Sequence, residues 1–213
     1  DGKVTQPSRG FTRISEPGQA LLIAARDGNI RKINSLLKSG TPVDYTTPGS
    51  YTPLAYATAR GHLRAASLLL KNGADINKKG RFDKSPLLLV AGSKHFKSAK
   101  FLVDRGADIK AIQWHKATCL HEAALWHQPK NLKFFADIGV DPNIVIGNGA
   151  SPLHWTIWRA NNDDESSLET AKTLIKILLE AGAKKSLKTN NGETAHDLAK
   201  NKGLDEIAAM LKP

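Results

Sequence analysis

The residue types in this chain that could do chemistry are a single cysteine, Cys119, and seven histidines. A zinc site would need Cys and His ligands at short, fixed spacings, and the sequence contains no such cluster. It contains neither a glycine-rich phosphate loop nor the turn that presents a nucleophilic serine. The residues therefore predict no metal centre, no cofactor and no enzymatic activity.

A short pattern recurs along the chain at a fixed interval. Four tetrads begin with Thr or Ser at positions 52, 85, 118 and 151, each 33 residues after the one before. The tetrads are Thr52-Pro53-Leu54-Ala55, Ser85-Pro86-Leu87-Leu88, Thr118-Cys119-Leu120-His121 and Ser151-Pro152-Leu153-His154. A period of this length indicates a solenoid, in which each unit buries its apolar face against its neighbours.

These tetrads resemble the start of the repeat in the ankyrin-repeat family, whose unit is a β-turn followed by two antiparallel helices. The resemblance covers about Gln19 to Pro213. It implies an all-α solenoid of helix-turn-helix units with β-turn fingers. We expect an N-terminal arm, 1–17, and one domain, 18–213. The expected repeats are 18–44, 45–77, 78–110, 111–143, 144–186 and a capping repeat, 187–213.

The residues around each tetrad predict where the helices begin and end. Thr or Ser can cap the first helix. Pro fits the next position, because the N–H group that it lacks would have no partner within the helix there. Gly73, Gly106, Gly139 and Gly182 are expected to end the second helices. Cys119 takes the place of that Pro, so a packed thiol is expected. In the family the tetrad histidines, here His121 and His154, hydrogen-bond locally between adjacent turns.

The fifth expected repeat is 10 residues longer than the others. The additional residues, near 161–170, are acidic and lie between its two helices. Loops on one face of a repeat protein are often its binding face. A solvated hairpin or an additional turn of helix would explain the insertion equally well, so both interpretations stay open.

Charge is distributed unevenly along the chain. Residues 1–110 hold 19 basic and 8 acidic side chains, whereas residues 111–213 hold 12 of each. Such an asymmetry bears on partners and encounter rates rather than on fold. A single cysteine excludes an internal disulfide. The start at Asp1 fits removal of a signal peptide, which slightly favours an exported or periplasmic protein, and fits a trimmed sequence as well.

All four tryptophans fall in the fourth and fifth repeats. In the ankyrin unit, recognition is carried by the fingers and by the exposed side of the first helix, which lines a concave groove. The resemblance therefore implies that the tryptophans are exposed anchors in this groove, because Trp is the residue most enriched at interface hot spots. The predicted partner-binding residues are Trp114, Trp126, Trp155, Trp158, His115, Glu122, Arg159, Tyr51, Tyr56, Arg60, Arg81 and Phe82.

The leading hypothesis is a non-enzymatic module that binds a folded protein with an acidic or protruding element, and inhibits or neutralises it. Small exported bacterial ankyrin proteins that protect a cell from its own wall-degrading enzyme are the comparison that the family suggests. The alternative is binding of an anionic polymer or a membrane surface through the basic N-terminal half. Nucleic acid is the less favoured ligand, no transmembrane segment is predicted, and the free chain is expected to be monomeric.

Overall fold

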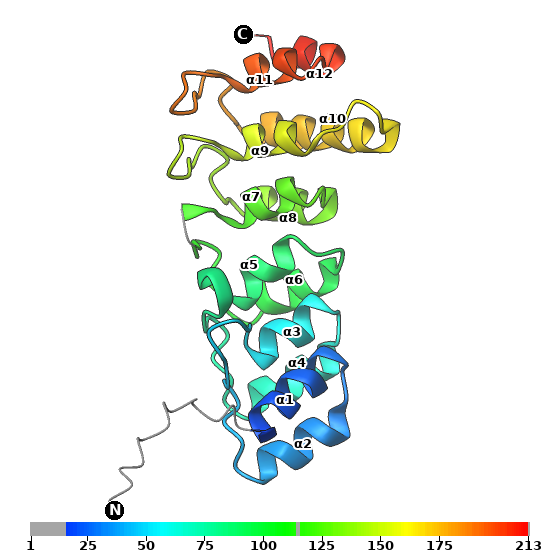
Figure 1. The fold of residues 1–213 in the computed structure, drawn as a ribbon, viewed down its shortest axis with the longest axis vertical. Helices are drawn as coiled ribbons and strands as arrows, with labels where there is room; N and C mark the ends of the chain where they lie inside the picture. Colours follow the sequence, from blue (N-terminus) through cyan, green and yellow to red (C-terminus); the bar gives the residue numbers. More distant parts are fainter. Residues whose placement is uncertain (1–15, 114–115, 213) are drawn as a thin grey trace, which may run out of the picture.

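The computed structural model describes residues 16–113 and 116–212, and these form a single elongated stack of helix pairs (Figure 1). Six pairs follow one another along the described chain, with α1 in the first pair and α12 in the last. The helices are α1 Glu16–Arg26, α2 Ile30–Lys38, α3 Pro53–Ala59, α4 Leu63–Lys71, the short 3₁₀ helix η1 Arg81–Asp83, α5 Pro86–Ala91, α6 Phe96–Val103, α7 Cys119–Leu125, α8 Pro129–Asp137, α9 Pro152–Arg159, α10 Glu165–Glu180, α11 Ala195–Asn201 and α12 Asp205–Met210. The predicted all-α solenoid is confirmed.

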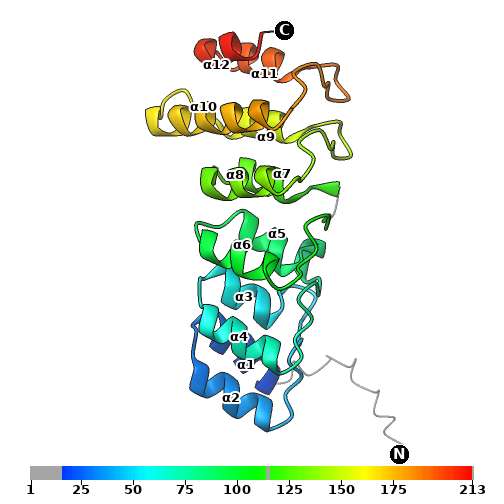
Figure 2. The same cartoon turned by 180° about the vertical axis from the view of Figure 1, so that it is seen from behind.

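The first helices of successive repeats pack on one another and form one layer, from α1 through α3, α5, α7 and α9 to α11. The second helices form the other layer, and the loops before each first helix extend from the stack on one side (Figure 2). We call the layer of first helices the inner layer and its exposed side the inner face. The layer of second helices is the outer layer, and we call the extended loops fingers. Only an isolated β-bridge, between Lys188 and Thr194, occurs in the described residues.

Hydroxyl groups cap the inner helices where the sequence predicts it. The Thr52 Oγ1 atom accepts the Ala55 N–H at 3.1 Å, and the Ser85 hydroxyl accepts the Leu88 N–H at 3.4 Å. In the next two repeats a histidine joins this cap. The Nδ1 atom of His121 lies 3.0 Å from the Thr118 hydroxyl, and its Nε2 atom lies 3.3 Å from the Ala150 carbonyl oxygen of the next repeat. Burial lowers the pKa of His121 to about 4.

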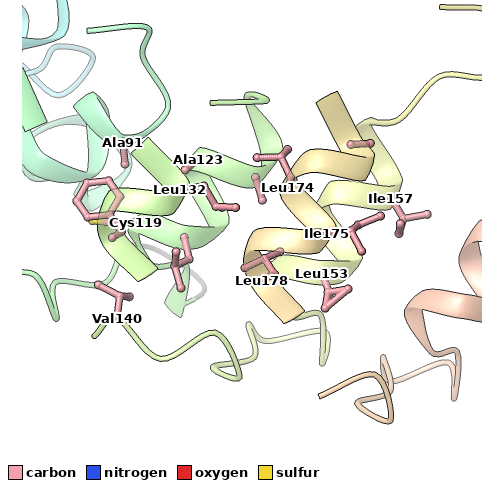
Figure 3. Close-up of a cluster of buried hydrophobic side chains, with 14 of the residues drawn as sticks. Ala91, Cys119, Ala123, Leu132, Val140, Leu153, Ile157, Leu174, Ile175 and Leu178 are labelled. Atoms are coloured by element: carbon pink, nitrogen blue, oxygen red, sulfur yellow. The ribbon is translucent and has the colours of Figure 1, made fainter. Parts of the chain in front are cut away.

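The core runs through the stack as two clusters of buried side chains. The larger spans repeats three to six, and the smaller spans repeats one and two. Ile76 and Phe101 are partly buried against both clusters and join them. Figure 3 shows part of the larger cluster, in which Leu174 and Leu178 of α10 lie between α8 and α9. The main contacts between helices accordingly join a helix to its own partner or to a neighbouring repeat.

The acidic insertion of repeat five lengthens its second helix. Helix α10 has 16 residues, whereas the second helices α2, α4 and α8 have 9 each. It extends beyond α8 and α12 on the side away from the fingers (Figure 2). Asp164 caps it by accepting the Ser167 N–H at 3.2 Å, and Lys172 pairs with both Glu169 and Glu206 of the capping repeat. The inserted residues therefore form additional turns of helix.

The fingers of repeats three to six are closed by the same backbone hydrogen bond. The amide N–H groups of residues 80, 113, 146 and 189 donate to the carbonyl oxygens of residues 84, 117, 150 and 193 at 2.9–3.0 Å. The residue two places before the tetrad has a positive φ in these fingers. It is glycine at positions 149 and 192, but Asp83 (φ 56°) and Lys116 (φ 68°) occupy it in repeats three and four.

A ladder of side-chain acceptors links the repeats at the base of the fingers. Asp44, Asn77 and Asn143 accept the backbone N–H groups of Asp75, Asp108 and Lys184 at 3.0, 2.9 and 2.8 Å. Lys110 stands at the equivalent position in repeat three and offers no acceptor to Asp141. The ladder is therefore interrupted between repeats three and four.

The interruption can be repaired by substitution. We expect Lys110→Asn to raise the free energy of unfolding by about 0.5–1 kcal/mol, because the new amide oxygen would accept the Asp141 N–H. Urea unfolding monitored by circular dichroism measures this. Lys110→Ala, which removes the lysine without supplying an acceptor, is the control. An equal gain in both variants would mean that removal of the lysine, and not the hydrogen bond, is responsible.

Acid should destabilise the fold through the buried histidine caps. His121 has a pKa of about 4 in the folded chain and about 6.5 when unfolded. Because the folded pKa is the lower, the stability is complete above pH 6.5 and is lost as the pH falls towards 4. We expect a loss of about 2 kcal/mol between pH 7 and pH 5 from this residue alone. A urea midpoint that is unchanged over that range would contradict the assignment.

Candidate functional site

The finger of repeat three presents an exposed aromatic ring on a strained backbone. Phe82 (φ 57°) and Asp83 (φ 56°) are consecutive non-glycine residues in the left-handed region. Such backbone costs of order 1 kcal/mol or more per residue and is found preferentially at functional sites. The Phe82 side chain is 48% exposed, and the Arg81 guanidinium lies 4.4 Å from its ring centroid. The Arg81 N–H donates to the Ser50 carbonyl oxygen at 2.9 Å, which fixes this finger against the preceding one.

Two tyrosines lie beside this finger on the inner face. The rings of Tyr51 and Tyr56 meet edge to face at a centroid distance of 5.7 Å, and both residues are half-buried. Burial raises the pKa of Tyr51, which stays a neutral hydroxyl. Tyr56 also borders a hollow of about 270 Å³ between α1 and the finger of repeat two. Arg60, at the end of α3, is exposed.

Trp126 and Trp158 are exposed where the sequence predicts it, at the ends of α7 and α9. Trp126 is 51% exposed and Trp158 is 39% exposed. The Trp126 ring lies against Gly92, since a β-carbon there would come within 2.4 Å of its Cδ1 atom. The backbone of each tryptophan is held in place. The Gln128 side-chain amide donates to the Trp126 carbonyl oxygen at 2.6 Å, and the Lys202 ammonium donates to that of Trp158 at 2.9 Å.

Trp155 is not the exposed anchor that the sequence predicts. It is half-buried against the larger core cluster, and its ring meets that of His121 edge to face at 5.2 Å. Its Nε1 atom is buried with no hydrogen-bond partner among the described residues. Trp155 therefore packs repeat five against repeat four. Trp158, three residues later, lies on the same face of α9 but outside this contact.

The prediction of Glu122 as an exposed binding residue is also wrong, because this residue is only 2% exposed. Its carboxylate accepts hydrogen bonds from the Lys84 ammonium at 2.7 Å and from the Gln113 side-chain amide at 2.5 Å. Lys84 comes from the finger of repeat three and Gln113 from that of repeat four. The carboxylate thus joins two fingers to α7.

Arg159 is exposed, and its charge contributes to the lowered pKa of His127, for which burial is the larger cause. His127 has a positive φ of 52°, and its Nε2 atom is buried without a partner in the described part of the chain. Trp114 and His115, the remaining predicted residues, lie outside the described residues. Gln113 and Gly92 were missed by the sequence reasoning. Alignment of the repeats could have singled out Gly92, which stands where the neighbouring repeats have Ala59 and Leu125.

The described residues offer little to a catalyst or a metal ion. No group of three or more His, Cys, Asp or Glu side chains among them could hold a metal. Cys119 is completely buried, and burial raises the pKa of its thiol, so the reactive thiolate is disfavoured. What the inner face does present is a set of exposed residues, Phe82, Trp126 and Trp158 with Arg60, Arg81 and Arg159. We call these six residues the display set.

Comparison with known proteins agrees with the repeat pattern and the helix stack. The sequence profile described as "Ankyrin repeats (3 copies)" matches residues 12–80. The crystal structure of an ankyrin repeat domain from Acinetobacter baumannii is 28% identical, with a TM-score of 0.74, over 90% of this chain and 95% of that one. The chain contains ankyrin repeats and has the ankyrin-repeat fold.

A second solved structure has the same fold. One chain of a complex between a predatory endopeptidase and an immunity protein of Bdellovibrio bacteriovorus is 22% identical to this ankyrin-repeat chain. The match has a TM-score of 0.73 and covers 91% of this chain and 96% of that one. A search of curated protein sequences returned no match. No helix among the described residues of the chain is both long and apolar enough to cross a membrane.

The Glu122 ion pair should matter for the stability of the repeats. We expect Glu122→Ala to cost roughly 3 kcal/mol of unfolding free energy, because it leaves the Lys84 ammonium mostly buried without its partner. Lys84→Met should cost a similar amount. A double-mutant cycle by urea unfolding measures the coupling. If the double variant lost the full sum of the two single costs, the two residues would not act as a pair.

Proposed function

We propose that this ankyrin-repeat protein binds a folded protein partner through its fingers and inner face, with the display set as the contact residues. Ankyrin repeats are protein-binding modules. The observation that supports the proposal most is the exposure of three large aromatic rings that the core does not use. Aromatic and arginine side chains are those that most often carry binding energy at interfaces.

The arrangement suits a rigid partner surface. Trp126 and Trp158 are held by hydrogen bonds to their own carbonyl oxygens, and Arg81 lies over Phe82. A residue that is already ordered loses less conformational entropy when it binds, so more of its contact energy appears as affinity. The three arginines add positive charge around the rings, and this favours a partner element that carries carboxylates.

We further propose that binding inhibits the partner and that the partner is a bacterial hydrolase. The support is the complex described above, in which a protein of this fold accompanies an endopeptidase. A concave protein that covers a protruding active-site rim would exclude substrate without any chemistry of its own. Capture of the partner from extracts of the producing cell, followed by an assay of cell-wall hydrolysis with and without the purified chain, tests this. Full hydrolysis by a saturated complex would rule out the inhibitor role and leave partner binding intact.

The unequal charge of the chain favours a second candidate, binding of an anionic polymer. Lys94 and Lys97 of repeat three are exposed, and neither has an ion-pair partner within the described residues. Such binding would weaken steeply as salt rises, because neutralised anionic groups release counterions. A titration with heparin at low and physiological salt measures it. Binding that is insensitive to salt would remove this candidate.

The display set and the core should respond oppositely to truncation. We expect Trp126→Ala, Trp158→Ala and Phe82→Ala each to cost roughly 2–4 kcal/mol of binding to the captured partner. Each should cost about 1 kcal/mol or less in unfolding, since the side chain is largely outside the core. Trp155→Ala is the matched control from the same helix and should cost roughly 3 kcal/mol of stability. Isothermal titration and urea unfolding give the two quantities. Normal binding by all three variants would exclude the display set.

A further inference from the structure

The outer layer carries a hollow that none of the display-set residues lines. It lies between α6, α8 and α10 and has a volume of about 470 Å³. Four half-buried apolar side chains, Phe96, Pro129, Phe134 and Ile177, form most of its lining. The rings of Phe96 and Phe134 meet edge to face at 5.6 Å, so the floor of the hollow is fixed by the packing of two neighbouring repeats.

Comparison of repeats three and four shows that the hollow is a local feature of this chain. Phe101 stands in repeat three where Phe134 stands in repeat four. The Arg105 guanidinium lies 3.7 Å from the Phe101 centroid and donates to the Phe101 carbonyl oxygen at 3.2 Å, so repeat three covers its own ring. The residue equivalent to Arg105 in repeat four is Ile138. Phe134 therefore has no such cationic cover and faces the hollow.

Positive charge lies at and beside this apolar floor. Lys130 of α8 lines the hollow, and Lys97 follows Phe96, which lines it, in the first turn of α6; both lysines are exposed. No carboxylate within the described part of the chain lies within ion-pairing distance of either ammonium group. Lys133 and Asp137 also line the hollow, and their charges are paired with each other at 3.0 Å. An apolar floor beside two unpaired lysines is complementary to a surface that combines large apolar side chains with carboxylates.

We propose that this hollow docks an acidic amphipathic helix of a partner protein. Two large apolar side chains, spaced three or four residues apart, would enter between Phe96, Phe134 and Ile177, while carboxylates beside them pair with Lys97 and Lys130. The described chain has no open strand edge at this face, so recognition by an added strand is not available. The hollow and the display set share no residue.

The test uses a synthetic 16-residue helical peptide, labelled with fluorescein, that carries Leu at four positions of one face and Glu on the other. Fluorescence anisotropy with the complete chain should show saturable binding. A peptide in which Lys replaces Glu, and one in which the same residues are reordered to spread Leu around the helix, should bind at least about tenfold more weakly, because each loses one half of the complementarity.

The repeats supply matched control variants, because Arg31, Arg64, Lys97 and Lys130 occupy one equivalent, exposed position in four successive repeats. The double variant Lys97→Glu, Lys130→Glu should weaken binding of the acidic peptide at least about tenfold. Arg31→Glu, Arg64→Glu makes the same change of charge elsewhere on the outer layer and should leave affinity within about twofold. Equal losses in the two double variants would mean non-specific attraction and would overturn the proposal.

A second pair of variants tests the apolar floor without altering charge. Ile177→Asn should weaken peptide binding about tenfold, and Leu68→Asn, at the equivalent position of repeat two, should not. Phe82→Ala and Trp126→Ala should bind the peptide normally, which separates this site from the proposed function. Two results would assign the face to another occupant. One is self-association of the chain that the double variant Lys97→Glu, Lys130→Glu abolishes. The other is binding to phosphatidylserine vesicles that this variant abolishes while its peptide binding persists.

Discussion

The fold depends on one constraint: no helix pair in this chain can bury its apolar face except against the neighbouring pair. Most core side chains are small or aliphatic, and the main contacts between helices lie within a repeat or between neighbouring repeats. The polar links obey the same rule. His121 reaches the carbonyl oxygen of Ala150, and Glu122 reaches Lys84. A stack of this kind is stabilised by neighbour contacts that are repeated along its length, and it leaves the side chains beyond those contacts available to bind other molecules.

The rigidity of the stack explains how strained and apolar residues can be kept at its surface. Phe82 and Asp83 hold a left-handed backbone that their side chains disfavour, and the hydrogen bonds from Gly80 to Lys84 and from Arg81 to Ser50 maintain it. The backbones of the exposed tryptophans are fixed by polar contacts to their carbonyl oxygens, and the Trp126 ring also lies against Gly92. In both cases the backbone is fixed before a partner arrives.

The sequence alone predicts the architecture because the period, the caps and the glycines are local signals. The tetrad hydroxyls, the proline after them and the helix-ending glycines all take the expected roles. The environment of a residue within the repeat is less predictable. Tyr56, Leu89, Glu122 and Trp155 occupy one equivalent position, yet Glu122 is buried and the other three are half-buried.

The reason for these differences lies in neighbours that the period does not specify. Glu122 is buried because Lys84, 38 residues earlier, reaches it from another finger. Trp155 packs inward because the His121 ring of the preceding repeat lies beside it. The interruption of the acceptor ladder at Lys110 and the uncovered ring of Phe134 also depend on comparing two repeats in space. A single repeat, read by itself, contains none of this information.

The central claim, that the fingers and the inner face recognise a protein partner, is tested most directly by hydrogen exchange. Amide exchange of the complete chain should be measured by mass spectrometry with and without the captured partner at saturation. The account predicts slower exchange in the complex at residues 80–84, 125–128 and 157–161, with little change in the second helices of repeats one and two. Protection confined to the outer layer, with the finger of repeat three unchanged, would contradict it.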